Sequence, residues 1–162
     1  MAPDGHGLTM LPFAAGERSP GWATHARAAI VGMSLDTRPV HIVRAALEAI
    51  AYRFTLIAEQ LPVFVSDDAS VIASGGALLH SPVWVQIMAD VLGRPVCLSG
   101  EEEASSRGAA LKALEAIGAI ETLSAVPAEM GRTFMPDAER HERYLSAIER
   151  QRELYDTIIA KG

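Results

Sequence analysis

The apolar positions of this chain are spaced most regularly between Val40 and Leu61. Apolar residues recur there in alternating steps of four and three, which predicts a helix with one continuous stripe facing the core. The stripe consists of Val43, Leu47, Ile50, Phe54, Ile57 and Leu61. Pro62 is expected to end this helix, because proline cannot continue its backbone hydrogen bonding. On another face, Arg44 and Glu48 are four residues apart, a spacing typical of a weak ion pair worth about 0.3–0.5 kcal/mol.

A second pattern, over residues 70–96, combines a strand, a turn with two glycines and an amphipathic helix. The run Ser70–Ala73 predicts a buried strand, and Ser81 followed by Pro82 predicts the start of the helix. The residues that then share one helical face are Trp84, Ile87, Met88, Val91 and Leu92.

The two glycines of this turn, Gly75 and Gly76, make it a candidate nucleotide-binding segment. Glycine lets a ligand approach the backbone closely, and the helix that follows begins with free N–H groups. The same arrangement also makes an ordinary connection between a strand and a helix, so the pattern alone leaves both interpretations open. The sequence has neither a G-x-x-x-x-G-K-[ST] phosphate loop nor a G-x-G-x-x-G fingerprint.

Shorter elements alternate with these helices. Short strands are expected over three ranges, Leu8–Phe13, Ala28–Val31 and Pro95–Leu98. Ser105 or Ser106 is expected to cap a helix that runs to Ile117, with Gly118 just beyond its end. The small residues of this helix would let it lie close against a sheet or another helix.

The C-terminal part of the chain is expected to hold a polar link and one further helix. The link covers Glu121–Pro136, and Asp137 is a suitable N-cap for the helix. Its inner face would consist of Tyr144, Ile148, Tyr155 and Ile159. Short strands that alternate with helices are typical of an α/β layered domain, here with a small sheet flanked by helices.

Composition and charge narrow the class of protein. Of the 162 residues, 49% are hydrophobic and 21% are charged, as in a soluble globular protein. The net charge of −6 is spread along the chain, which argues against a nucleic-acid partner because such a partner requires a basic patch. No apolar run is long enough to span a membrane, and the start does not resemble a signal peptide. The one cysteine, Cys97, is expected to be a small core residue of a strand, which fits a reducing cytoplasm.

Four segments in a fixed order carry a further signal. They are Leu11–Pro20, Arg44–Tyr52, Gly75–Val96 and Glu103–Ala110. They resemble, in this order, motifs of the C-terminal nucleotide-binding domain of the FGGY family of carbohydrate kinases, among them L-P-x-x-x-G-E-R-x-P, R-A-x-x-E-G-x-A-F and E-x-x-x-x-G-A-A. Within the family the likeness is to the xylulokinase and gluconokinase branch. The chain departs from the usual pattern by one extra residue between its second turn glycine and the helix start.

The resemblance implies an actin-like ATPase (ribonuclease H-like) fold, in which two domains close over ATP and a sugar. Residues 1–162 would be the C-terminal nucleotide-binding domain, with a core over 8–118 and a helical extension over 119–162. The N-terminal domain, which binds the sugar and holds the catalytic residues, would be absent. The full-length enzyme would phosphorylate a sugar or sugar acid with ATP, and Mg²⁺ would be held mainly by the missing domain. The isolated chain would be inactive.

Two groups of residues are implied as sites by this resemblance. The first would line the adenosine or α-phosphate side of the nucleotide and comprises Gly75, Gly76, Ala77 and His80. His80 is equally open to a role as a solvent-facing loop residue. The second lies in a loop that would face or shape the interdomain cleft and comprises Gly16, Glu17 and Arg18. Within this loop, Glu17 and Arg18 could pair with each other as scaffolding, or one of them could contact the substrate or the partner domain.

The remaining carboxylates have structural interpretations. Asp67 and Asp68 are expected in a turn, and Glu101–Glu103 in a solvated loop. Asp90 is expected either on a helix surface or in a structural hydrogen bond. No residue of this chain is therefore expected to act as the catalytic base or as a metal ligand.

Two other classes of function stay open from the sequence. The chain could be a non-catalytic interaction or dimerisation module that presents the apolar faces of its long and C-terminal helices to a partner, including a second copy. A methyltransferase-like domain could use the two turn glycines for its cofactor, although no acidic residue ends a following strand. Thermal stabilisation by ATP analogues would favour the kinase, and a concentration-dependent dimer without a nucleotide response would favour the module.

Overall fold

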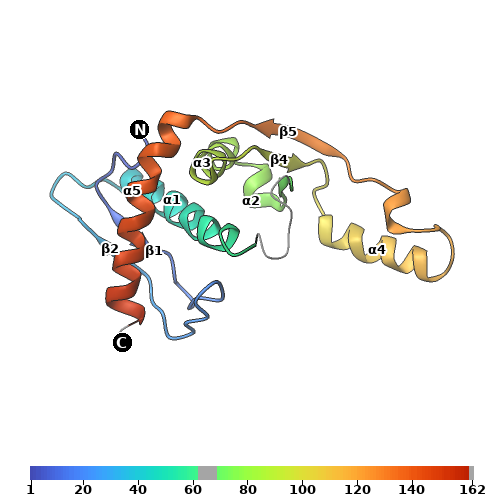
Figure 1. Ribbon diagram of the computed structural model, residues 1–162, viewed down its shortest axis with the longest axis horizontal. Helices are drawn as coiled ribbons and strands as arrows, with labels where there is room; N and C mark the ends of the chain where they lie inside the picture. The colour runs from blue at the N-terminus through green and yellow to red at the C-terminus, as the bar shows by residue number, and fades with distance from the viewer. Residues whose placement is uncertain (62–68, 161–162) are drawn as a thin grey trace.

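The structure is a computed structural model that describes residues 1–61 and 69–160 (Figure 1). Its strands are β1 (Thr9–Leu11), β2 (Ala29–Val31), β3 (Val71–Ala73), β4 (Val96–Ser99) and β5 (Met130–Phe134). Its helices are α1 (Pro39–Ala58), α2 (Gly76–Leu79), α3 (Pro82–Leu92), α4 (Ala104–Ala116) and α5 (Ala138–Tyr155), with short helical turns at η2 (Leu123–Ala125) and η3 (Asp156–Ala160). Pro62, Asp67 and Asp68 lie outside the described residues. Within those residues, no helix combines the length and the apolar character needed to cross a membrane.

Two small sheets organise the chain. Strands β1 and β2 form an antiparallel hairpin, and β3, β4 and β5 form a second sheet in that order. Strand β3 is parallel to β4, with Val71 opposite Val96, and β5 is antiparallel to β4. The α/β class with a small sheet is confirmed. Strand β5 was not expected, because only Phe134 of its five residues is buried and its polar composition is typical of a link.

The main core lies between α1, α3, α5 and the second sheet. Its buried members include Tyr52, Val85, Val91, Val96 and Tyr144. A smaller core under the hairpin consists of Leu11, Phe13, Ala26 and Ile159. Residues 119–162, expected as an extension, therefore supply one strand to the sheet and buried side chains to both cores. Asp137 caps α5 as expected, since its carboxylate accepts a hydrogen bond of 3.0 Å from the Arg140 N–H.

Helix α1 begins next to its expected first residue, ends at Ala58 rather than at Leu61, and buries a different face. Three members of the predicted core stripe are exposed: Val43 by 59%, Phe54 by 44% and Leu61 by 43%. The face that is buried consists of Ala45, Glu48, Ala49, Ala51, Tyr52 and Arg53. Its alanines allow α3 and α5 to pack closely, and its long polar side chains find partners inside the protein. The expectation that the apolar stripe faces the core of this chain is therefore wrong for these three positions, whereas Leu47 packs against the main core.

Helix α4 also departs from expectation. None of its residues is buried, and the ribbon places it at the end of the molecule away from α1 and α5 (Figure 1). The small residues of this helix therefore do not bring it against the sheet. Its N-cap is Glu103 rather than a serine, and no side-chain bond caps it. The end of the helix is as expected, because Gly118 has a φ of 75° and the next amide, of Ala119, bonds Leu114 O at 2.9 Å.

Candidate functional site

The glycine turn follows the last residue of β3. Gly75 has a φ of 96°, a left-handed conformation that favours glycine, and it starts the four-residue helix α2. His80 ends α2, and Ser81 and Pro82 begin α3 at the predicted positions. The sequence analysis did not predict α2, because four residues are too few to produce a periodic pattern.

The turn is open to solvent. A Cβ built on Gly75 would meet no atom within 4 Å, and one built on Gly76 would meet only the His80 ring, at 3.9 Å. Ala77 and His80 are exposed as well. The preceding strand is also less buried than expected, since Ile72 is 53% exposed. A ligand can therefore reach the backbone of this turn without displacing a side chain.

Strand β4, the parallel neighbour of β3, ends at the same edge of the sheet, but the backbone after its last residue is covered. Parallel strands direct their carboxyl ends to one edge, where ligands bind in open α/β sheets. After β4, the Gly100 N–H bonds Glu129 O at 2.8 Å, and the Glu101 N–H bonds the Ser99 hydroxyl at 3.0 Å. A Cβ on Gly100 would lie 2.8 Å from the Glu129 side chain. Of these two strand ends, only that of β3 offers uncovered backbone.

The second predicted group lies in the loop between β1 and β2. Glu17 is buried and accepts hydrogen bonds from Arg53 and from the Tyr155 hydroxyl, the latter at 2.6 Å. The Arg53 guanidinium lies against two aromatic rings, 5.1 Å from the centroid of Phe13 and 4.8 Å from that of Tyr155. Burial, and then the hydrogen bond to Glu17, raise the pKa of Tyr155 to about 12. Glu17 thus pairs with Arg53 and not with Arg18, which was one of the two roles considered for these residues.

Gly16 and Arg18 flank this buried ion pair. Gly16 has a φ of 85°, and a Cβ there would lie 2.6 Å from Thr24 O, so the loop requires glycine at this position. Arg18 is exposed. Both residues line a hollow of about 360 Å³ that also contacts the exposed side chain of Phe54.

Glu48 is the centre of a buried polar cluster. Its carboxylate accepts hydrogen bonds from five donors, which are the Asp4 N–H, His6 Nε2, Arg44 Nε, the Tyr52 hydroxyl and the Tyr144 hydroxyl. Burial acts to raise the pKa of Glu48, but the hydrogen bonds from His6 and Arg44 outweigh it, and the pKa lies below its usual value. The expected weak pair with Arg44 is instead part of a buried network that joins the N-terminal segment, α1 and α5.

Three members of this neighbourhood could in principle be metal ligands. Asp4, His6 and Glu48 have potential ligand atoms within 4.8 Å of one another. His6 Nδ1 accepts a hydrogen bond from the Leu8 N–H, so the ring proton is on Nε2 and points at Glu48. Asp4 pairs with Arg150 at 2.5 Å. A protonated ring nitrogen and two nearby arginines do not fit a cation, and the cluster is a structural ion-pair network.

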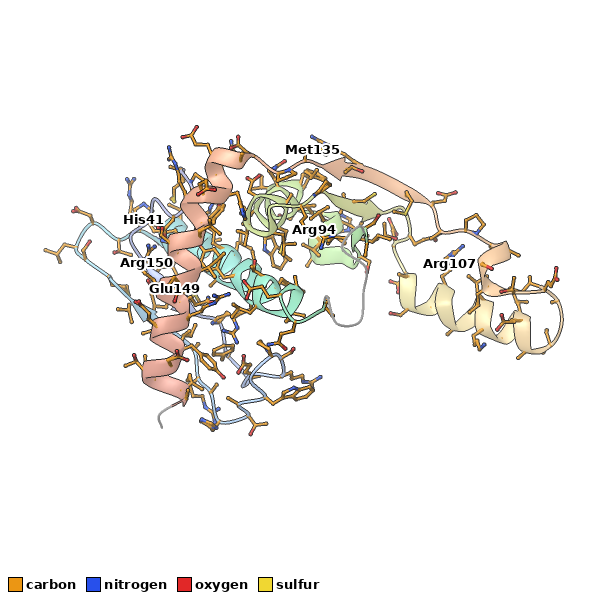
Figure 2. All side chains as sticks on the ribbon, viewed as in Figure 1. His41, Arg94, Arg107, Met135, Glu149 and Arg150 are labelled. Carbon is orange, nitrogen blue, oxygen red and sulfur yellow. The ribbon has the colours of Figure 1, made fainter. Side chains whose placement is uncertain are left out.

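Asp90 is the centre of a second structural cluster. Of its two expected roles, helix surface or structural hydrogen bond, it has the second. Its carboxylate accepts hydrogen bonds from Gln86 Nε2 at 2.7 Å and from the Asp137 N–H at 3.0 Å. Gln86 also bonds the carbonyl oxygen of Met135, which lies between β5 and α5 in Figure 2. These contacts tie α3 to the start of α5.

In open α/β sheets, ligands bind outside the carboxyl ends of the strands, and the uncovered glycine turn lies at such an end. The comparisons with known proteins define the family. The model of the FGGY family of carbohydrate kinases, C-terminal domain, matches residues 1–117, and the chain belongs to this family. The resemblance noted from the four sequence segments is thereby confirmed, and the methyltransferase alternative falls away.

Individual relatives agree with the family match. The chain is 31% identical to the gluconokinase of Bacillus subtilis (strain 168) over 150 residues, which are 90% of the chain and 29% of that protein. The structure matches a ligand-bound xylulose kinase from Lactobacillus acidophilus with a TM-score of 0.84 and 25% identity, over 97% of the chain and 32% of that protein. It matches the xylulose kinase from Rhodospirillum rubrum with a TM-score of 0.78 and 34% identity, again over 97% and 32%. The chain thus spans about a third of the length of these relatives.

Proposed function

We propose that a protein containing this chain transfers the γ-phosphoryl group of ATP to a hydroxyl of a sugar or sugar acid, such as xylulose or gluconate. In this proposal the chain contributes the side of the active site that binds adenosine. The observation that carries it is the uncovered Gly75–Gly76 backbone at the carboxyl end of β3. The family membership and the relatives named gluconokinase and xylulose kinase support the reaction class.

The residues of the turn fit a nucleotide by size and position. Gly75 and Gly76 would let the ribose or α-phosphate approach the backbone, and the small Ala77 leaves the same space open. His80, exposed at the end of α2, would contact the nucleotide from the other side of the turn. The loop with Gly16, Glu17 and Arg18 would shape the interdomain cleft. In this loop the side chain of Arg18 is exposed, whereas that of Glu17 is buried.

The remaining chemistry is assigned to the part of the protein outside this chain. Phosphoryl transfer needs Mg²⁺ to neutralise the phosphates and an acceptor for the hydroxyl proton. Within the described residues, the group with metal-ligand spacing is the Glu48 network, which does not fit a cation. Residues 1–162 would then be the C-terminal portion of a two-domain kinase in the cytoplasm, inactive in isolation, and a homodimer would be compatible with this role.

The test uses a rebuilt kinase. In it, this chain replaces the matching third of the Rhodospirillum rubrum xylulose kinase. ATP turnover is measured with xylulose, gluconate and glycerol, in wild-type form and with Gly76→Val. The control, Ser146→Val, adds a branched side chain at an exposed position of α5. We expect Gly76→Val to reduce turnover and Ser146→Val to leave it unchanged. Equal turnover of the wild type and both variants would show that the turn is not part of the site.

The exposed face of α1 favours a second candidate, the non-catalytic interaction module. The same rebuilt kinase separates the two candidates. A folded protein without turnover on any of the three substrates, combined with concentration-dependent dimers of the isolated chain, would support the module.

A further inference from the structure

The loop between β1 and β2, which lies beside the C-terminal end of α5 (Figure 1), holds an exposed tryptophan. Trp22 is 71% exposed, and its φ is 55°. A bulky residue rarely adopts this left-handed conformation, because it costs about 1–3 kcal/mol and persists only where the surrounding structure enforces it. Backbone strain of this kind is concentrated at functional sites. The loop therefore holds its largest apolar side chain in solvent against the local preference of the backbone.

The base of the loop enforces this conformation. The Glu17 N–H bonds Ala23 O at 3.0 Å and so closes the segment that contains Trp22. Gly21 lies directly against the Tyr155 hydroxyl and the Glu17 carboxylate, and a Cβ at this position would clash with both. The direction of Trp22 is thus fixed before any partner arrives, which lowers the entropic cost of an association.

Two charged side chains of the same region have no partner within the chain. Among residues 1–61 and 69–160, neither Arg18 of the loop nor Asp156 at the end of α5 makes a side-chain hydrogen bond or an ion pair. Both are exposed. A cation and an anion that share one patch but do not pair with each other are complementary to the same patch on a second copy.

A hollow beside the loop has the size of one large side chain. Its volume is about 270 Å³, whereas pockets for drug-sized ligands have about 300–1,000 Å³. It is lined by Pro20, Gly21, Leu56, Gln60, Tyr155 and Asp156, together with two arginines that have carboxylate partners within the chain. Apolar groups and polar groups are therefore both present in the lining. This mixture suits an indole, which has an apolar body and one N–H donor.

We propose that this patch joins two copies of the chain. Trp22 of each copy occupies the hollow of the other copy, and Arg18 of each copy pairs with Asp156 of the other. Residues 20 and 21 line the hollow and directly precede Trp22, so the indole and the hollow lie on one patch. Contacts that are exchanged in this way define a dimer with two-fold symmetry.

The occupant is a second copy because the patch carries both halves of each contact. The indole has a hollow of matching size, and the unpaired cation has an unpaired anion. Tryptophan and arginine are also the residue types that most often dominate the binding energy of protein interfaces. The inference depends on the geometry of this patch and not on the proposed reaction.

The test reverses charges and measures the dimer dissociation constant by sedimentation over a concentration series. Arg18→Asp and Asp156→Arg each bring like charges together and should each raise the constant by about tenfold or more. The double variant restores opposite charges, and its constant should return to within about threefold of the wild type. Trp22→Ala should raise the constant by about 30-fold or more. Glu142→Arg, which reverses an exposed acid elsewhere on α5, is the control and should leave it unchanged.

Several outcomes would overturn the inference. One is a wild type that stays monomeric at every concentration. Another is a dimer that Trp22→Ala does not weaken, since a different surface, such as the exposed stripe of α1, would then hold it. Single reversals that weaken the dimer without recovery in the double variant would contradict the pairing of Arg18 with Asp156.

Two additions complete the experiment. Circular dichroism verifies that each variant is folded, as expected because all the changed side chains are exposed. The series is repeated in the rebuilt kinase, where the same pattern is expected; its loss there would mean that the rest of the kinase covers the patch and would overturn the inference for the longer protein. No readout uses ATP or turnover, so a failure here is distinct from a failure of the proposed function.

Discussion

Replacing Glu48 by glutamine should remove the central charge of the chain without changing the shape of the side chain. The carboxylate is fully buried and accepts from five donors, one of them the Arg44 guanidinium. An amide offers one acceptor oxygen and adds a donor group. In Glu48→Gln, part of the donor set would therefore face an NH₂ group, and the charge of Arg44 would lose its partner in a largely buried position.

The expected loss of unfolding free energy follows from the burial of the Arg44–Glu48 pair. Breaking a buried ion pair by removing one partner costs about 3–5 kcal/mol, whereas an exposed i,i+4 pair contributes about 0.3–0.5 kcal/mol. Glu139→Gln is the matched control, because Glu139 pairs with Arg143 at the same spacing and its side chain is 78% exposed. Urea unfolding of the chain, followed by circular dichroism, measures the loss of stability in both variants. At a slope of about 2 kcal/mol/M, Glu48→Gln should lower the midpoint by about 2 M, and Glu139→Gln by less than about 0.3 M.

The pH dependence supplies an independent check. The pKa of Glu48 in the folded chain lies below the 4.5 of an unperturbed glutamate. A carboxylate with a lowered folded-state pKa contributes stability above pH 4.5, and this contribution is lost as the pH falls through the folded-state pKa. The wild type should therefore lose stability more steeply below pH 4.5 than Glu48→Gln does. Equal stability losses for Glu48→Gln and Glu139→Gln at neutral pH would refute the reasoning.

Three further predictions concern other positions. Gly76→Val should raise the KM for ATP of the rebuilt kinase by about tenfold or more and change stability by less than about 1 kcal/mol, since the added side chain meets only a distant ring; an unchanged KM would be inconsistent with a nucleotide at this turn. Glu17→Gln should lower the pKa of Tyr155 from about 12 toward its usual value of 10.0, measured by tyrosinate absorbance, and an unchanged titration would argue against the hydrogen bond. Gly93→Ala should destabilise by about 1–3 kcal/mol in urea unfolding, because its Cβ would lie 2.7 Å from the His141 ring and its φ is 63°; a neutral effect would contradict this packing.

The longer helices could be predicted from the sequence because their signals are local. The start of α3 at Ser81 and Pro82, the N-cap at Asp137 and the glycine after α4 depend on residues within one or two turns. The family could also be identified, because its motifs are short segments in a fixed order. Trp84 behaves as a partly buried residue whose indole N–H donates to Leu47 O at 3.1 Å, as a buried indole requires.

The face that α1 buries could not be predicted, because two stripes with the same helical period compete. The apolar stripe has the larger side chains, but Ala45, Ala49 and the partners of Glu48 decide the packing within this chain. The choice depends on contacts with His6 and Tyr144, which are 42 and 96 residues away from Glu48 in the sequence. The partner of Glu17 was missed for the same reason, since Arg53 is 36 residues away.

The glycine turn could be located from the sequence, but its exposure could not. Exposure depends on β3 being an edge strand and on α2, neither of which has a periodic signal. Strand β5 was not predicted because its side chains are mostly exposed, and the exposure of α4 was not predicted because small residues are typical of a packed helix.

The most direct test of a nucleotide site at the end of β3 is amide hydrogen exchange of the rebuilt kinase with a non-hydrolysable ATP analogue. Calorimetry first establishes that the analogue is bound. The exchange of residues 75–77 should then slow by about fivefold or more, because the nucleotide would cover backbone that is open in its absence. A bound analogue that leaves the exchange of these three residues unchanged would contradict the account.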